Sequence, residues 1–262
     1  MNWRRLLARS VSETVALARS AVPPAAGFRI LLYHAVGTPI AEDRLGIYTI
    51  SPERFERHVE ALAAFAGNTF VGLADGLAGG GLRTAVTFDD GYKDNLHVAA
   101  PILLKHGIPF TVFISTSFVH NRDARYLSPE EVKELSMLPG VTIGAHGATH
   151  IPLTRCDDVA LAREVGDSKR YLEDLTGKEV ASMSYPHGAV DGRVRDAVEA
   201  AGYALAACSH FDINRPDRDP LLLARTDILG NDTERILRQK LHGDWDWYRY
   251  RGSDPSCETH GA

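Results

Sequence analysis

The chain has 262 residues, with 29 Lys or Arg against 34 Asp or Glu, and its length allows one large domain or two small ones. With 44% hydrophobic and 24% charged residues, the composition is that of a globular protein and argues against a disordered or membrane-embedded chain. The net charge of −5 argues against a nucleic-acid partner, and three widely separated cysteines indicate neither a disulfide framework nor a thiolate zinc site.

Residues 1–26 are predicted to form a basic amphipathic helix that Pro23 and Pro24 end. Apolar residues recur at helical spacing from Trp3 to Ala18, and arginines occupy positions between them. The apolar run is too broken for a secretory signal and too short for a membrane span, so we expect a cytoplasmic protein. Two interpretations stay open: the helix packs on the domain, or residues 1–20 touch an anionic membrane surface at the inner face.

From Phe28 onward, short β-branched or aromatic runs alternate with helical patterns. The predicted strands are residues 28–34, 84–88, 108–114, 141–143, 180–184 and 203–207. Helices are predicted between them, with Ser51 as one N-cap and a capping box at Ser128. This alternation predicts βαβ units, and six or seven of them favour a parallel barrel over a short open sheet. In such barrels the chemistry lies at the carboxyl ends of the strands.

Three polar clusters directly follow predicted strands: Thr87–Gly91 (TFDDG), Gly144–His150 (GAHGATH) and Ser184–Gly188 (SYPHG). The side chains of adjacent Asp residues diverge, so one could bind a metal while the other has a different role, although Asp-Asp-Gly alone is more often a turn. Two histidines spaced i and i+4 would converge on one ion if they shared a helical turn. Two imidazoles and one carboxylate suit zinc or a similar divalent ion, and their joint occurrence favours a single site.

TFDDG followed by H-x-x-x-H at strand ends resembles the polysaccharide deacetylase family, the NodB-homology carbohydrate esterases, over about residues 28–246. The resemblance implies a distorted (β/α)7 barrel, so we assign residues 27–246 to a catalytic domain and 247–262 to a polar C-terminal tail. It also implies removal of acetyl groups from N-acetylated sugars with one divalent metal ion, zinc first, with cobalt, nickel or manganese left open.

The same resemblance implies a role for each matching residue. Asp90, His146 and His150 would be the metal ligands, and Asp89 would be the general base for a metal-activated water. The backbone N–H of His187 would stabilise the oxyanion.

Two departures from the family pattern leave roles open. Ser184 stands where the best-known members carry an Arg, and this third motif resembles the Tyr-Pro-x-Gly branch that includes poly-N-acetylglucosamine deacetylases. Arg225 could fill the missing role or be a structural arginine. The C-terminal Leu-x-His that usually supplies the general acid is absent. In the Tyr-Pro-x-Gly branch the general acid lies in an N-terminal Tyr-His dipeptide, which matches Tyr33-His34 here. We therefore favour His34 as the general acid, with His242, or a purely structural role for His34, as the alternatives.

The expected function is therefore metal-dependent deacetylation of a carbohydrate: an amino-sugar conjugate, an oligosaccharide or a polysaccharide precursor. The alternatives are a deformylase of a lipid-linked amino sugar, a ring-opening amidohydrolase, or a glycan-binding module without catalysis. The aromatic residues between Trp245 and Tyr250 could form a sugar-stacking wall or pack a helix on the barrel. The oligomeric state stays open.

Overall fold

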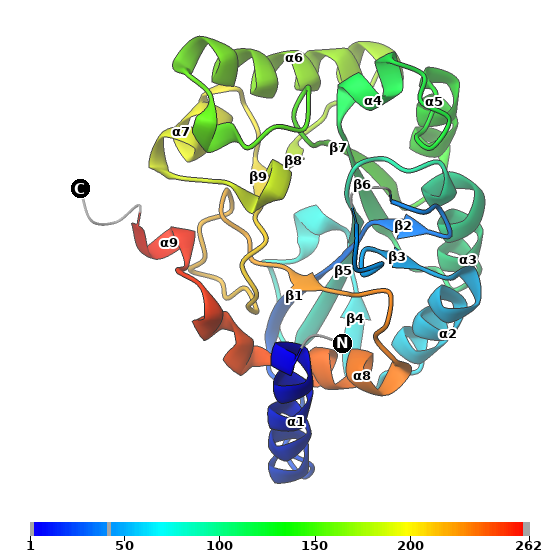
Figure 1. The fold of residues 1–262 in the computed structure, drawn as a ribbon, viewed down its shortest axis with the longest axis vertical. Helices are drawn as coiled ribbons and strands as arrows, with labels where there is room; N and C mark the ends of the chain where they lie inside the picture. The colour runs from blue at the N-terminus through cyan, green and yellow to red at the C-terminus, as the bar shows by residue number, and fades with distance from the viewer. Residues whose placement is uncertain (1–2, 41–42, 259–262) are drawn as a thin grey trace.

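The computed structural model describes residues 3–40 and 43–258. Its centre is a curled sheet in which the strand order is β10–β1–β5–β6–β7–β8–β9, with β4 added beside β5, and every pairing is parallel (Figure 1). The strands of this sheet are β1 (Gly27–Tyr33), β4 (Asn68–Phe70), β5 (Leu82–Phe88), β6 (Phe110–Ile114), β7 (Val141–Ala145), β8 (Ser182–Ser184), β9 (Leu205–Ala207) and β10 (Thr226–Asp227). A separate pair joins β2 (Ala35–Val36) and β3 (Thr49–Ile50).

Helices surround this sheet and cover its outer face (Figure 1). They are α1 (Trp3–Ala18), α2 (Pro52–Ala63), α3 (Ala100–Lys105), α4 (Thr116–His120), α5 (Pro129–Met137), α6 (Asp158–Thr176), α7 (Gly192–Ala200), α8 (Glu234–His242) and α9 (Pro255–Glu258). Short 3₁₀ turns occur at Leu73–Asp75, Leu153–Arg155, Pro186–Gly188 and Asp246–Arg251, the last labelled η5 here, and a π-helical turn at Asn95–Ala99 precedes α3.

One segment near the C-terminus closes the sheet into a ring. Leu223 pairs with Ala207 of β9, and three residues later Thr226 pairs with Leu31 of β1. The segment 221–228 therefore pairs with β9 on one side and with β1 on the other, and it bridges the gap between these two strands. The predicted distorted (β/α)7 barrel is confirmed, although the sequence analysis did not predict β10.

Local sequence signals act where they were expected. Ser51 caps α2 by accepting from the Arg54 N–H, and Ser128 forms a reciprocal capping box with Glu131 at the start of α5. Gly177 ends α6 in the left-handed conformation that glycine adopts at least cost. The backbone N–H groups at the N-terminal ends of α2 and α5 thus find hydrogen-bond partners in the neighbouring sequence.

The N-terminal helix packs on the barrel through a different face from the predicted one. Ala8 and Ser12 are buried, and the Ser12 hydroxyl accepts a hydrogen bond of 3.0 Å from the Trp247 indole N–H. Trp3, Leu7 and Val11 of the apolar stripe are instead 63%, 55% and 43% exposed. The interpretation that the helix packs on the domain is therefore confirmed, although the contact is made by small side chains and not by the apolar stripe.

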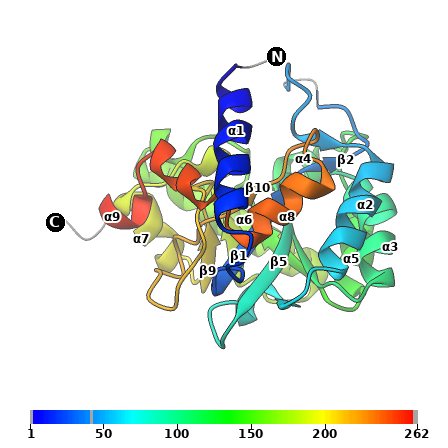
Figure 2. The same cartoon turned by 90° about the horizontal axis from the view of Figure 1, so that it is seen from below.

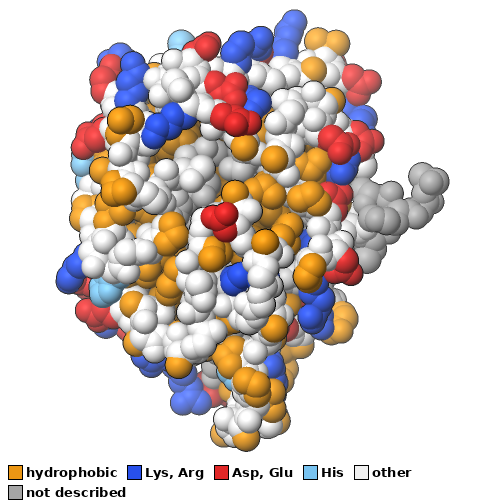
Figure 3. Space-filling view, turned by 180° about the vertical axis from the view of Figure 1, so that it is seen from behind, with side chains coloured by type: hydrophobic (Ala, Val, Ile, Leu, Met, Phe, Trp, Pro, Cys, Tyr) orange, Lys and Arg blue, Asp and Glu red, His pale blue; other side chains and the backbone are white. Residues whose placement is uncertain are grey.

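Figure 2 shows α1 lying beside α8 and the red-orange C-terminal turns, and Figure 3 shows hydrophobic side chains continuing to the lower tip of the molecule, where α1 ends. None of the helices in the described ranges is long and apolar enough to cross a membrane.

The C-terminal aromatic residues pack rather than line the active-site cavity. Trp245 is buried in a cluster with Ala8, Phe211 and Ile236, and Tyr248 packs against the same cluster. This supports the packing interpretation of the Trp245–Tyr250 run. Beyond it, Asp254 pairs with Arg218 at 2.6 Å, so the predicted tail makes defined contacts up to that point.

Candidate active site

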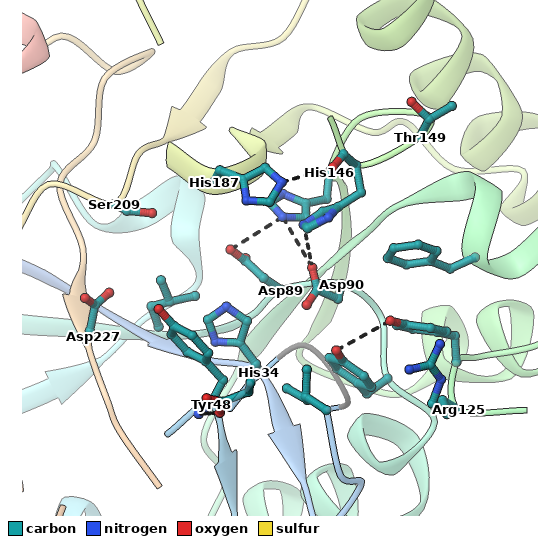
Figure 4. A pocket seen from close by; sticks show the side chains of 17 residues that line it. His34, Tyr48, Asp89, Asp90, Arg125, His146, Thr149, His187, Ser209 and Asp227 are labelled. Carbon is teal, nitrogen blue, oxygen red and sulfur yellow. Dashed lines mark hydrogen bonds and ion pairs between the residues drawn. The ribbon is translucent and has the colours of Figure 1, made fainter. Parts of the chain in front are cut away.

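The three polar clusters meet at one cavity of about 640 Å³ at the carboxyl ends of the strands (Figure 4). All six residues predicted for the site line it: His34, Asp89, Asp90, His146, His150 and His187. A volume of this size suits a small ligand such as a sugar unit.

Asp90, His146 and His150 form a group that could hold a metal ion. One ligand atom from each residue lies within 4.8 Å of the other two. His150 Nε2 is 3.1 Å and His146 Nε2 is 3.5 Å from Asp90 Oδ1. This buried oxygen has no hydrogen-bond partner among the described residues. A carboxylate oxygen that faces two imidazole nitrogens without a hydrogen bond fits a divalent cation.

The sequence analysis considered that the two histidines could converge on one helical turn. In the structure they converge through a loop instead. Residues 146–150 form a loop after β7, with φ of 70° at Gly147 and 60° at His150. The buried Glu164 of α6 holds this loop by accepting from the N–H groups of Ala148 and Thr149, at 2.8 and 2.9 Å. The i, i+4 spacing therefore converges through left-handed backbone and a carboxylate anchor.

The ring of His146 is oriented by a backbone group. Its Nδ1–H donates to the Ser184 carbonyl at 2.8 Å, which leaves the Nε2 lone pair facing Asp90. Burial lowers the pKa of His146 to about 4, although the nearby Asp89 and Asp90 oppose this shift. The imidazole is therefore neutral at pH 7, which is the form that binds a metal.

Asp89 is held by the one arginine that the sequence analysis considered for this role. Arg225 donates from Nη1 and Nη2 to the two Asp89 oxygens at 2.7 and 2.8 Å, and its Nε–H donates to the Cys208 carbonyl at 3.0 Å. The Ser184 hydroxyl, at the third-motif position, donates to Asp89 at 3.1 Å and accepts from Arg225 at 2.8 Å. Arg225 reaches the carboxylate from the strand that closes the barrel.

Charge decides the ionisation state of Asp89. Burial alone would raise its pKa, but the Arg225 guanidinium and His146 outweigh burial and hold the pKa well below its ordinary range. Asp89 is thus ionised at neutral pH and fixed in one orientation.

The backbone is strained at this site. Four non-glycine residues in the described ranges have positive φ, and three of them are Asp90, His150 and His187, at 75°, 60° and 58°. Such conformations cost energy and concentrate at functional sites. Among the described residues, the N–H of His187 makes no backbone-to-backbone hydrogen bond, whereas those of Gly188 and Ala189 close turns onto Tyr185 and Pro186.

The structure separates the two histidines considered as general acid. His34 lines the cavity opposite Asp89 and Asp90, and its buried Nδ1 has no hydrogen-bond partner in the described ranges (Figure 4). His242 lies outside the cavity, where its ring nitrogens contact the Val22 carbonyl and the Asp244 carboxylate, each at 2.7 Å. Only His34 is placed to reach a substrate held there.

Sequence reasoning missed two acidic residues of this site. Asp227 lines the cavity from the end of β10, next to β1. Glu164 anchors the histidine loop from α6. The apolar run 221–224 before Arg225 is a strand-like signal that could have identified Asp227 as a strand-end residue. A glutamate on an amphipathic helix carries no comparable signal.

Comparisons with known proteins agree with this fold. Residues 80–206 match the family model described as polysaccharide deacetylase. The Bacillus subtilis protein named "Putative polysaccharide deacetylase YxkH" is 32% identical over 121 residues, which are 46% of this chain and 42% of that protein. The chain thus spans about two fifths of the length of this relative.

Two solved structures are similar over most of the chain. The Streptococcus pyogenes deacetylase PplD, in complex with acetate, has a TM-score of 0.73 and 23% identity, covering 83% of this chain and 99% of that one. BC0361, a polysaccharide deacetylase from Bacillus cereus, has a TM-score of 0.71 and 25% identity, covering 82% of this chain and 69% of that one.

These findings show that the chain has a NodB-type barrel fold. Residues 80–206, which match the polysaccharide deacetylase model, form the middle of this barrel, and β1 and the closing segment 221–228 complete it.

Proposed function

We propose that this protein is a metal-dependent hydrolase that removes the acetyl group from an N-acetylated sugar. The observation that carries the proposal is the pairing, in one cavity, of an ionised Asp89 clamped by Arg225 with the Asp90–His146–His150 group. A base and a ligand set for a divalent ion then face the same substrate. Zinc suits this His₂Asp set, as cobalt, nickel and manganese also do.

Asp89 acts as the general base. It accepts one proton from a water molecule whose oxygen attacks the acetamide carbonyl carbon. A divalent ion held by Asp90, His146 and His150 would supply Lewis-acid polarisation of the water and the carbonyl. Because Arg225 and Ser184 fix the carboxylate, the base needs no reorientation during the reaction.

His187 and His34 supply the two remaining functions, which are oxyanion stabilisation and proton donation to the leaving amine. The His187 backbone N–H stabilises the negative charge that develops on the carbonyl oxygen. His34 then gives a proton to the amine nitrogen as the C–N bond breaks, which yields acetate and the free amino sugar. The resemblance to the family at Tyr33-His34 implies the same role for His34.

Acetate release from a panel of N-acetylated sugars tests the proposal. Purified protein loaded with zinc should release acetate, and His146→Ala/His150→Ala should lose both the metal and the activity. The double variant His97→Ala/His120→Ala removes two histidines outside the cavity and should keep both. Formate in place of acetate would favour a deformylase, and a wild type that binds no metal would overturn the mechanism.

We also propose that α1 binds an anionic membrane surface and so places the protein at the inner face of the membrane. Its exposed stripe includes Trp3, Leu7 and Val11, and its sequence carries three arginines with one acidic residue, Glu13. An exposed apolar face flanked by basic residues is typical of helices that lie in a membrane interface.

Vesicle sedimentation tests this second proposal. The wild type should bind phosphatidylglycerol vesicles and not phosphatidylcholine vesicles. Leu7→Ser/Val11→Ser should weaken binding by about tenfold, the equivalent of ~1.4 kcal/mol. Met137→Ser/Val159→Ser removes two apolar side chains outside α1 that are more exposed than Leu7 and Val11, and it should bind as the wild type does. Equal binding by all three proteins would contradict the proposal.

A further inference from the structure

A second, smaller cavity of about 130 Å³ adjoins the active-site cavity. Tyr48 and Asp227 line both cavities, so their side chains form the shared wall. Figure 4 shows both residues beside His34, on the side of the active site away from Arg125. The second cavity continues from this wall to α1, whose Ala8 and Arg9 form part of its lining.

The inner surface of this cavity is largely aromatic. Phe211, Trp245 and Tyr248 belong to one packed cluster and all line the cavity. Trp245 and Tyr248 belong to the C-terminal aromatic run, which the proposed reaction does not use. This cluster also includes Ala8 of α1, and the Trp247 indole N–H of η5 donates to Ser12 of α1, so η5 packs directly against α1 beside the cavity.

Two guanidinium groups stand at the cavity without a carboxylate partner. Arg9 of α1 donates to the Asn231 carbonyl at 3.2 Å, and Arg251 of η5 lies with its Cζ 4.6 Å from the Tyr248 ring centroid. Within the described ranges, neither forms an ion pair, whereas Arg235 and Arg249 nearby are paired with Glu13 and Asp212.

The acidic residues of the cavity do not neutralise these arginines. Asp232 is paired with the buried Lys240 at 2.6 Å, and Lys240 also donates to the Asp227 carbonyl at 2.6 Å. Burial raises the pKa of Asp227, although Lys240, His34 and Arg225 oppose this shift. The two arginines outnumber this one carboxyl group. The cavity therefore has a net positive charge that comes from Arg9 and Arg251.

Size indicates which part of a ligand fits. Cavities that take whole small molecules are roughly 300–1,000 Å³. The active-site cavity is within this range and the second cavity, at about 130 Å³, is well below it. The second cavity thus suits one group of a larger ligand whose main part occupies the active site. Paired guanidinium groups bind phosphate oxygens strongly because their planar N–H donors match them.

We propose that this second cavity binds the phosphate of a phosphate-linked N-acetyl amino sugar while the sugar's acetamide lies in the active site. This inference rests on the proposed deacetylase function and names its substrate class. The phosphate could belong to a nucleoside diphosphate or to a lipid carrier, and both present the same charged group to Arg9 and Arg251.

Direct binding of inorganic pyrophosphate, measured by isothermal titration calorimetry, tests the cavity independently of turnover. The zinc-loaded wild type should bind pyrophosphate, and Arg9→Gln/Arg251→Gln should bind it at least about tenfold more weakly. Arg163→Gln/Arg170→Gln removes two exposed arginines of α6 and should match the wild type. Equal binding by all three proteins, or no binding, would overturn the proposal.

Turnover then identifies the carrier. The ratio of kcat/KM for a phosphate-linked substrate to that for a neutral methyl glycoside should fall about tenfold in Arg9→Gln/Arg251→Gln and stay constant in the α6 control. The ratio is measured for two phosphate-linked substrates, a nucleoside-diphosphate sugar and a short isoprenyl-diphosphate sugar. The substrate with the higher ratio shows whether the phosphate belongs to a nucleotide or to a lipid carrier. An unchanged ratio in both arms overturns the inference. Pyrophosphate binding that depends on both arginines, without acetate from any substrate, supports the anion site and contradicts the proposed function instead.

Discussion

Asp89→Asn is expected to lower kcat for sugar N-deacetylation by about 10²–10⁴-fold, the usual contribution of a general base. The amide is nearly the same size as the carboxylate but cannot accept the proton of the attacking water. The metal ligands are unchanged, so the variant should still bind one zinc ion. Acetate release and metal content, measured on the same preparation, check the two halves of the prediction.

The variant also leaves Arg225 as a buried charge without its counter-ion, so its folding has to be checked. Circular dichroism and thermal unfolding would show whether the activity loss reflects an unfolded protein. Asp174→Asn, an exposed change on α6, provides the matched control and should keep wild-type kcat. An Asp89→Asn protein that is folded, binds zinc and retains more than about a tenth of the wild-type kcat would exclude Asp89 as the base.

Arg225→Met should destabilise the protein by about 3–5 kcal/mol at pH 7, because removing one partner of a buried ion pair leaves the other charge uncompensated. Asp89 is 3% exposed and Arg225 is 0% exposed, so the carboxylate that remains after the substitution is only slightly solvated. Urea unfolding at pH 7 measures the loss. Arg225→Lys keeps the charge but not the two-pronged contact, so its loss should be smaller.

The pH dependence separates this explanation from simple loss of packing. The pKa of Asp89 lies below its ordinary value, so its ion pair stabilises the folded state above about pH 4 and this stabilisation fades as the pH falls through the folded-state pKa. In Arg225→Met, burial raises the pKa of Asp89, and the carboxyl becomes neutral under mildly acidic conditions. The stability difference from the wild type should therefore shrink at acidic pH, and the acid limb of kcat/KM should move to higher pH. A difference that is constant with pH would indicate packing alone.

The sequence was informative where the signal is local. The buried parallel strands are short β-branched or aromatic runs, and the N-caps at Ser51 and Ser128 depend only on neighbouring residues. The site residues were predictable because polar residues that directly follow such strands must meet at one end of a parallel barrel.

Features that depend on distant contacts were not predictable in this way. Arg225 and Asp89 are 136 residues apart, and their contact depends on the register with which β10 pairs with β1. A two-residue strand is too short to show a pattern, so the sequence left Arg225 open between two roles. The loop at His146 and His150 illustrates a different gap, because an i, i+4 spacing cannot distinguish a helical turn from a left-handed loop anchored by Glu164.

Helical periodicity also failed to identify which face of α1 packs. The apolar stripe gave the stronger signal, but Ala8 and Ser12 make the contact because their short side chains fit against Trp247 and the neighbouring aromatic cluster. Helical periodicity shows that a helix has an apolar and a polar face, but the face that contacts the barrel also depends on the shapes of the side chains that meet there.

The closing segment has a consequence for the order in which this protein becomes competent during synthesis. A ribosome that has released residues 1–220 has already delivered Asp89 and every metal-ligand candidate, but not Arg225 or Asp227. Such a nascent chain has an open barrel edge and an unclamped base. Because one stretch of eight residues supplies both the barrel closure and Arg225, we expect the proposed activity to require the last strand, and chains terminated before it to be inactive.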